Sequence, residues 1–284
     1  MQDLKIFIQL TRLNKPIGFM LLFWPCSWGL AYAYYFDQNL SIFLYHIFLF
    51  FLGSVLMRSA GCIFNDIVDK DFDKLVERTK ERPIASGKIS AKKSLFYVLL
   101  LCGVSFLILI QFNYKTILLG LGSMFLAFSY PFMKRITYWP QLFLGLTFNW
   151  GVIMGCTAIL DQISIGIVLL YIAAIFWTLG YDTIYGLQDI EDDEIIGVKS
   201  TSIKFKGNIK MFVSTCYLIT FLFLIFFLQN NIGLNLSTFF TFMFILSLLY
   251  QIRIFNKNNS INCLKAFKMN NFSGFFIFLA ILSN

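Results

Sequence analysis

Apolar segments of about twenty residues alternate with short polar segments along almost the whole chain. A helix that crosses a bilayer needs about 20 predominantly apolar residues, and most of these segments approach that length. We therefore predict nine transmembrane helices, over Ile17–Phe36, Ile42–Phe64, Ser94–Phe112, Tyr114–Pro131, Trp139–Leu160, Ile163–Tyr181, Met211–Leu228, Leu234–Phe255 and Phe267–Ser283. Because short turns join several of them, we expect a helix bundle and not a β-barrel. The fold class is all-α, a polytopic membrane helix bundle of about nine transmembrane helices, in a single membrane-embedded domain over residues 1–284.

Composition supports the membrane assignment and limits the function. The chain is 58% hydrophobic and only 13% charged, with a mean hydropathy of +0.73, which excludes an ordinary soluble protein. Its net charge of +8 does not indicate nucleic acid, because 21 of the 23 Lys and Arg residues fall in segments on one side of the predicted bundle. We expect a multi-pass protein of the bacterial inner membrane, with that side cytoplasmic, or facing the matrix in an organelle. The lipid bilayer is an expected partner, and no obligate protein partner is evident.

Two short segments concentrate the acidic residues. Twelve of the fifteen lie in NDIVDKDFDKLVERTKER (65–82) and YDTIYGLQDIEDDE (181–194). Counted as helix, the first segment places Asn65, Asp66, Asp69 and Asp73 on one face, with Asp71 pointing away. The second places three acids together in the same way, Asp182, Asp189 and Asp193. Stacked carboxylates repel one another unless a cation lies between them, and an all-oxygen set suits Mg²⁺.

Other interpretations of these segments account for less of the pattern. Either segment alone is typical of a solvated loop between membrane helices. An EF-hand loop is excluded, because Lys74 and Lys80 stand where that loop needs Gly and Glu. A CDP-alcohol phosphotransferase is disfavoured because its motif is absent. A transporter with acidic coupling sites would place acids inside the spans, which are nearly free of them.

Basic residues surround both acidic segments. Six of them are candidate diphosphate ligands: Lys74, Arg78, Arg82, Lys134, Arg135 and Lys199. A metal held by two acidic faces and ringed with Lys and Arg predicts a diphosphate site, because such a site neutralises the charge of a leaving group. At the end of a membrane bundle it suits a diphosphate that carries a hydrocarbon tail. An isoprenyl diphosphate has that chemistry.

Arg58 is a basic residue inside a predicted span. It lies seven residues before Asn65 and therefore on the same helix face, so it either points towards the site or snorkels to the lipid headgroups. Both interpretations are open on the sequence alone.

Four segments together carry a resemblance to a known family. RLNKPIGFMLLFWPCSWGL (12–30), MRSAGCIFNDIVDKDFDKLVERTKERPIASGKIS (57–90), YPFMKRITYWPQLFLG (130–145) and YDTIYGLQDIEDDEIIGVKSTSIKF (181–205) resemble the UbiA superfamily of intramembrane prenyltransferases. They look most like its 4-hydroxybenzoate polyprenyltransferases. The resemblance implies Mg²⁺-dependent transfer of a prenyl group from polyprenyl diphosphate to the ring carbon ortho to the hydroxyl of 4-hydroxybenzoate, in ubiquinone biosynthesis. A UbiA-type enzyme with another aromatic acceptor is the alternative.

The resemblance also implies residue roles. Five residues would hold Mg²⁺ against the diphosphate: Asn65, Asp69, Asp73, Asp189 and Asp193. Asp66 and Asp182 would support the chemistry beside them, and Asp182 is a candidate to accept the ring proton. Arg58 or Lys15 would bind the carboxylate of the acceptor. One departure from the family pattern is Lys206, which stands between Phe205 and Gly207 and leaves the end of that loop open.

Overall fold

The computed structural model describes residues 2–229 and 232–284, and regular structure in these ranges is helical. Eight helical segments of the described chain are long and apolar enough to cross a bilayer. They are α2 (Ile17–Asp37), α3 (Leu40–Val68), α5 (Ala91–Leu109), α6 (Tyr114–Ile136), α7 (Pro140–Phe148) together with α8 (Trp150–Leu160), α9 (Ile165–Gly186), α12 (Ile209–Leu228) and α13 (Leu236–Ile254). The predicted fold class, an all-α membrane bundle, is confirmed.

The ninth predicted span corresponds to α14 (Ser260–Leu282), which begins seven residues before the predicted Phe267. Its 23 residues extend about 34 Å, enough to span the hydrocarbon. The first half of α14 carries Lys265 and Lys268. These charges lower the local hydropathy, so the predicted span begins later than the helix does. Asn259 caps it, accepting a hydrogen bond from the backbone N–H of Asn262.

The fifth predicted span, Trp139–Leu160, is broken into two helices at Asn149. The buried Asn149 amide donates to Gly145 O at 2.7 Å and to Thr178 Oγ1 at 2.8 Å. Gly145 O also accepts from the backbone N–H of Asn149 at 3.3 Å, so the carbonyl is satisfied where the helix is interrupted, which a membrane interior requires. The predicted span is confirmed, but it consists of two helices and not of one.

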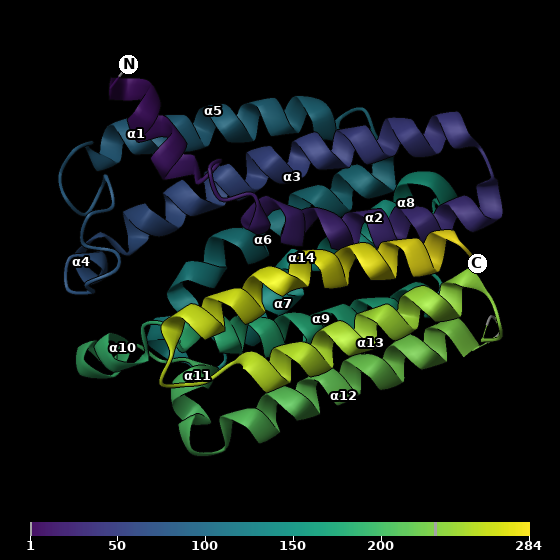
Figure 1. Ribbon diagram of the computed structural model, residues 1–284. Coiled ribbons are helices and arrows are strands. Elements are labelled where there is room, and N and C mark those ends of the chain that lie inside the picture. Colours follow the sequence, from purple (N-terminus) through teal and green to yellow (C-terminus); the bar gives the residue numbers. More distant parts are fainter. Residues whose placement is uncertain (1, 230–231) are drawn as a thin grey trace.

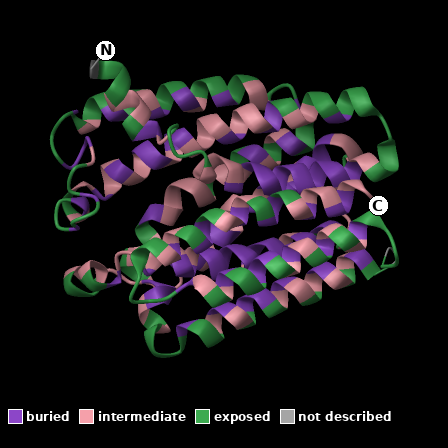
Figure 2. Cartoon of the chain, viewed as in Figure 1, coloured by how far each residue is buried: buried purple, intermediate pink, exposed green. Residues whose placement is uncertain are grey.

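The bundle forms a ring of helices that closes where α14 packs on α2, with α8 against α2 inside it. Helices α2 and α8 approach very closely: a Cβ added at Gly29 would lie 2.1 Å from Val152 O, and one at Gly155 2.4 Å from Cys26 O. Small residues allow such contact between membrane helices. Buried residues gather on these inner helices and on α9, whereas the outer helices expose large apolar side chains (Figure 2).

The short elements gather at one end of the bundle (Figure 1). They are α1 (Gln2–Thr11), α4 (Lys70–Asp73), α10 (Ile190–Ile196), α11 (Thr201–Lys204) and the 3₁₀ turn Lys206–Asn208. Both acidic segments are therefore on the same side of the bundle, and the C-terminus is at the opposite end (Figure 1).

This arrangement predicts a definite membrane topology. Reporters fused after Lys88 and after Lys199 should both be cytoplasmic, because basic residues cluster beside both loops. A reporter fused after Asp161, in the opposite turn, should be external and serves as the control. Opposite locations for the first two reporters would contradict the topology.

Candidate active site

A cavity of about 1340 Å³ begins among the acidic segments and continues into the bundle. Along α3 and the turn after it, every helical turn from Asp69 back to Leu49 contributes residues that line this cavity. The wall is charged at the end with the acidic segments and apolar further in. The bundle thus contains a passage with a polar mouth and an apolar interior.

The first acidic segment is stacked as the helix count predicted. Although α3 ends at Val68, the backbone N–H of Asp69 donates to Asn65 O at 2.9 Å and that of Asp73 to Asp69 O at 2.8 Å. The Asp66, Asp69 and Asp73 side chains are all buried, whereas the Asp71 side chain is 89% exposed. Asn65 Nδ2 donates to Asp69 Oδ2 at 2.9 Å. The face prediction is confirmed for this segment.

The second segment spans the end of α9 and the start of α10. Asp182 lines the cavity from α9, Asp189 precedes α10, and Asp193 lies one turn further on, where its N–H donates to Asp189 O at 2.9 Å. Burial, and then the nearby Asp189 charge, raise the pKa of Asp193 to about 6. All three line the same cavity as the first segment.

Arginine and lysine side chains connect the two segments. Arg78, between α4 and α5, binds both carboxylate oxygens of Asp189, with Nε 2.6 Å from Oδ1, and donates to Tyr185 OH at 3.2 Å. Arg82 binds Asp66 at 3.0 Å and Asp73 at 2.8 Å. Lys134 Nζ, on α6, is 2.5 Å from Asp69 Oδ2. Three predicted cations therefore lie at the mouth of the cavity and pair with the predicted metal ligands.

The other three predicted diphosphate ligands do not line this cavity. Lys74 pairs with the exposed Asp71 at 3.0 Å, because α4 is one turn long and the chain turns away after Asp73. Lys199 donates to Ile136 O at 3.2 Å. Arg135 donates to Val68 O at 2.7 Å and lies 3.7 Å from Asp69 Oδ1, so it pairs with a predicted metal ligand without lining the cavity.

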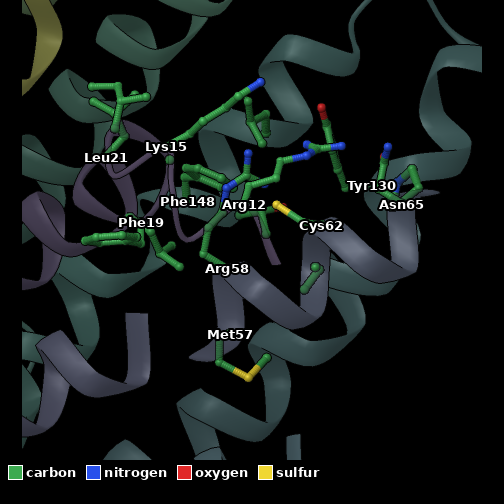
Figure 3. Close-up of a pocket in the computed structure, with 18 of the residues that line it drawn as sticks. Arg12, Lys15, Phe19, Leu21, Met57, Arg58, Cys62, Asn65, Tyr130 and Phe148 are labelled. Atoms are coloured by element: carbon green, nitrogen blue, oxygen red, sulfur yellow. The ribbon is translucent and has the colours of Figure 1, made fainter. Parts of the chain in front are cut away.

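Arg58 faces the cavity. Its guanidinium lies over the Phe148 ring, 5.3 Å from the centroid, and its Nε is buried without a hydrogen-bond partner among the described residues. A Cβ at Gly18 would lie 3.0 Å from this Nε, so the glycine makes room for it. The position disfavours snorkelling to the headgroups. Lys15 is exposed and lines the same cavity (Figure 3).

Arg12 is a site residue that the sequence analysis missed. It lies in the turn between α1 and α2 at φ 55°, and its Nη2 is 2.6 Å from Asp66 Oδ1, the oxygen that Arg82 also binds. Figure 3 places it beside the cavity with Arg58 and Tyr130. From the sequence, Arg12 counts only among the basic residues that indicate membrane orientation. Nothing in its neighbourhood along the chain indicates a partner 54 residues away.

The departure at Lys206 lies outside the cavity. Lys206 opens a 3₁₀ turn and pairs with Glu194 at 2.6 Å, while the Phe205 ring stacks on Phe212 with centroids 3.9 Å apart. The inserted lysine is accommodated on the surface of the loop.

The oxygen donors at the mouth fit a hard divalent cation. Within residues 2–229 and 232–284, no three His, Cys, Asp or Glu side chains converge closely enough to hold a metal together, and the carboxylates of Asp73 and Asp69 pair with Arg82 and Lys134. Asp69 Oδ1 is buried and accepts no hydrogen bond from the described chain, although Arg135 Nη2 lies 3.7 Å away. Carboxylate and amide oxygens are the ligands that Mg²⁺ takes.

Comparison with known proteins agrees with these motifs. The UbiA prenyltransferase family model matches residues 22–279. The chain belongs to the UbiA prenyltransferase family. The resemblance inferred from the four sequence segments is thereby confirmed, and the site described above lies almost entirely within the matched region.

Curated relatives of this UbiA-family chain include a mitochondrial 4-hydroxybenzoate polyprenyltransferase from Caenorhabditis elegans. It is 47% identical over 213 residues, which cover 75% of this chain and 59% of the relative. A 4-hydroxybenzoate octaprenyltransferase from Tolumonas auensis is 39% identical over 277 residues, covering 96% of this chain and 94% of the relative. Matches to the first curated relatives span only 53% to 59% of their length.

A UbiA homologue from Archaeoglobus fulgidus, solved bound to GPP and Mg²⁺, has the same fold. Its TM-score is 0.73 at 18% identity, over 98% of this chain and 100% of that chain. At this identity the likeness concerns the arrangement of helices and not the roles of residues.

The buried pair between Arg12 and Asp66 predicts a stability difference. Arg12→Gln should lower the free energy of unfolding by about 1–3 kcal/mol, because the Asp66 side chain is only 2% exposed and loses one of its two cations. Lys93→Gln, which removes the exposed pair with Asp3, is the matched control and should have a smaller effect. Thermal unfolding in detergent measures both, and equal shifts would contradict the prediction.

Proposed function

We propose that this chain transfers a polyprenyl group from polyprenyl diphosphate to the ring carbon ortho to the hydroxyl of 4-hydroxybenzoate, in ubiquinone biosynthesis. One observation carries the proposal: both acidic segments meet, with Arg78, Arg82 and Lys134, at the mouth of a cavity whose interior is apolar. A lipid diphosphate has the matching chemistry. The names of the curated relatives support the choice of acceptor.

The charged mouth would bind the diphosphate. Five residues would hold Mg²⁺, namely Asn65, Asp69, Asp73, Asp189 and Asp193. The bound Mg²⁺ would supply positive charge that stabilises the departing diphosphate. Arg78, Arg82 and Lys134 would exchange their carboxylate partners for diphosphate oxygens, to which they donate charge-assisted hydrogen bonds. Asp66 would position Arg12 and Arg82 by accepting a hydrogen bond from each.

The inner part of the charged region would hold the acceptor. Arg58 has an unused buried N–H and lies over Phe148, so it is suited to bind the carboxylate of the benzoate, with Lys15 nearer the mouth. The bond between prenyl C1 and the diphosphate oxygen breaks, and a bond forms between C1 and the ring carbon ortho to the hydroxyl. Asp182 would accept the proton that this ring carbon loses. The apolar walls would exclude water from the allylic carbon.

The same proposal places the protein in a membrane. We infer the bacterial inner membrane with the active site on the cytoplasmic side, which the distribution of basic residues supports. Residues of both the first transmembrane helix, α2, and the last helix, α14, line the cavity, which supports a single membrane-embedded domain over residues 1–284.

The metal hypothesis is tested with membranes, Mg²⁺, radiolabelled 4-hydroxybenzoate and prenyl diphosphates. Chelation should abolish product and Mg²⁺ should restore it. Asp69→Asn and Asp189→Asn should each lower kcat/KM at least about 100-fold, because a lost transition-state contact of this kind is worth several kcal/mol. Asp71→Asn, in the same motif but exposed, is the control and should retain near-normal turnover. Near-normal turnover in Asp69→Asn or Asp189→Asn would move the site elsewhere.

Arg58 separates acceptor binding from diphosphate binding. Arg58→Ala should raise the KM for 4-hydroxybenzoate at least tenfold while changing the KM for the prenyl diphosphate little, because Arg58 lies about 10 Å deeper along α3 than Asn65. Slow hydrolysis of the diphosphate without acceptor should persist. If Arg58→Ala raised the KM for both substrates equally and also abolished this hydrolysis, Arg58 would be assigned to the diphosphate instead.

A further inference from the structure

The chain between α9 and α11, here called the acidic loop, carries Asp189 and Asp193 and is closed at its base by buried hydrogen bonds. Thr183 on α9 precedes the loop and Thr201 on α11 follows it, and their Oγ1 atoms lie 2.6 Å apart. Thr183 Oγ1 also donates to Leu179 O at 2.6 Å, so the proton between the two threonines comes from Thr201. Both threonines are fully buried. The acidic loop therefore leaves the bundle and returns to it at one fixed point.

The returning end of the acidic loop is also bound to α7 and α9. Ser202 Oγ donates to Thr183 O, on α9, at 2.8 Å. The Thr201 N–H donates to Oε1 of the buried Gln141, on α7, at 3.0 Å. The contact with α9 is close, because a Cβ added at Gly186 would lie 2.5 Å from Ser202 Oγ. These hydrogen bonds fix the base of the acidic loop against two helices of the bundle.

Lys134 connects this base to the first acidic segment. Its Nζ pairs with Asp69 at 2.5 Å, and its carbonyl oxygen accepts from the Lys199 N–H at 2.9 Å. The next residue back along the acidic loop, Val198, donates its N–H to Asp193 O at 3.0 Å. A chain of direct contacts thus runs from Asp69, through the base of the acidic loop, to Asp193.

The base of the acidic loop is suited to keep the two acidic segments in register while ligands bind. In the proposed function, on which this inference rests, Arg78 exchanges Asp189 for diphosphate oxygens, so that ion pair no longer holds the segments together. The hydrogen bonds at the loop base take no part in the exchange. We propose that Gln141, Thr183 and Thr201 are positioning residues. They hold the acidic loop at the distance from the first segment at which both bind one magnesium–diphosphate group.

The test measures how activity depends on the Mg²⁺ concentration. Thr201→Val removes the hydroxyl that closes the base and keeps nearly the same side-chain shape. It should raise the half-saturating Mg²⁺ concentration at least tenfold, because Mg²⁺ requires closely defined ligand geometry. The kcat at saturating Mg²⁺ and the KM for 4-hydroxybenzoate should change less than threefold. Thr201→Ser, which keeps the hydroxyl, should restore the wild-type Mg²⁺ dependence.

A matched control separates positioning from a general loss of stability. Thr220 on α12 is also buried, and its hydroxyl donates to Cys216 O in the same helix at 3.0 Å. Thr220→Val should leave the Mg²⁺ dependence unchanged. A variant that is merely destabilised loses active protein, which lowers the measured kcat without changing the half-saturating Mg²⁺ concentration. Thr183→Val removes the acceptor of the same bond, and the same tenfold shift is expected if Thr201→Val fails to fold.

A double variant tests whether Gln141 acts through the loop base or by contact with a ligand, since Gln141 also lines the cavity. Residues that act through one shared segment have non-additive effects. The half-saturating Mg²⁺ concentration of Gln141→Leu/Thr201→Val should therefore be within about threefold of that of the more affected single variant. Shifts that multiply in the double variant, or an unchanged Mg²⁺ dependence in both threonine variants, would overturn the inference.

Binding measured without turnover distinguishes failure of this inference from failure of the proposed function. Mg²⁺ and geranyl diphosphate together should raise the Tm of the purified protein, and Thr201→Val should need at least tenfold more Mg²⁺ for the same rise. If that shift is found but the wild type transfers no prenyl group, the proposed reaction alone is contradicted. If the wild type is active but Thr201→Val changes neither the Mg²⁺ dependence of Tm nor that of activity, the positioning role alone is contradicted.

Discussion

Carboxylates buried in an apolar bundle must be paired with cations, and this requirement organises one end of the molecule. Arg78 holds Asp189 across the gap between the two acidic segments, and Lys134 holds Asp69. Because the paired groups come from loops and helices far apart in the sequence, the ion pairs also determine which elements stand next to one another. An anionic ligand that formed ion pairs with these cations would leave the buried carboxylates without a positive partner, and a second cation would then have to pair with them. The arrangement is therefore suited to a diphosphate and a divalent cation binding together.

The rest of the bundle differs in how tightly it is packed. On the side of α9, α12, α13 and α14, a buried hydrogen-bond network runs from Trp177 through Asn270 to Gln251, which also accepts from Tyr217 at 2.7 Å. Such a satisfied network favours one arrangement of helices. Along the inner faces of α3 and α6, by contrast, the cavity takes the place of packed side chains. The molecule thus combines a firmly packed region with a region that leaves room for a ligand.

The cavity wall is charged at one end of the passage and apolar at the other. Charge is confined to the mouth, where water and ions reach the loops, and Arg58 is the deepest cation on the α3 face that lines it. Further in, the wall consists largely of side chains such as Phe50 and Met154 that offer no hydrogen bond. The charged part and the apolar part of a ligand would thereby meet different environments within one passage.

Much of the fold was determined by the sequence alone, because a membrane span needs about 20 apolar residues and this constraint is local. The stacking of Asn65, Asp69 and Asp73 was also local, since helical periodicity places them on one face. Contacts between residues distant in sequence, which periodicity does not indicate, appear only in the tertiary structure. It broke the fifth span at Asn149, where Thr178 on α9 supplies a hydrogen-bond partner, and it extended α14 through a polar first half by packing it on α13 and α2. In the tertiary structure Arg12 also binds Asp66, and Lys74 points away from the site. The direction of a side chain at a helix end depends on how the chain turns and on partners distant in sequence.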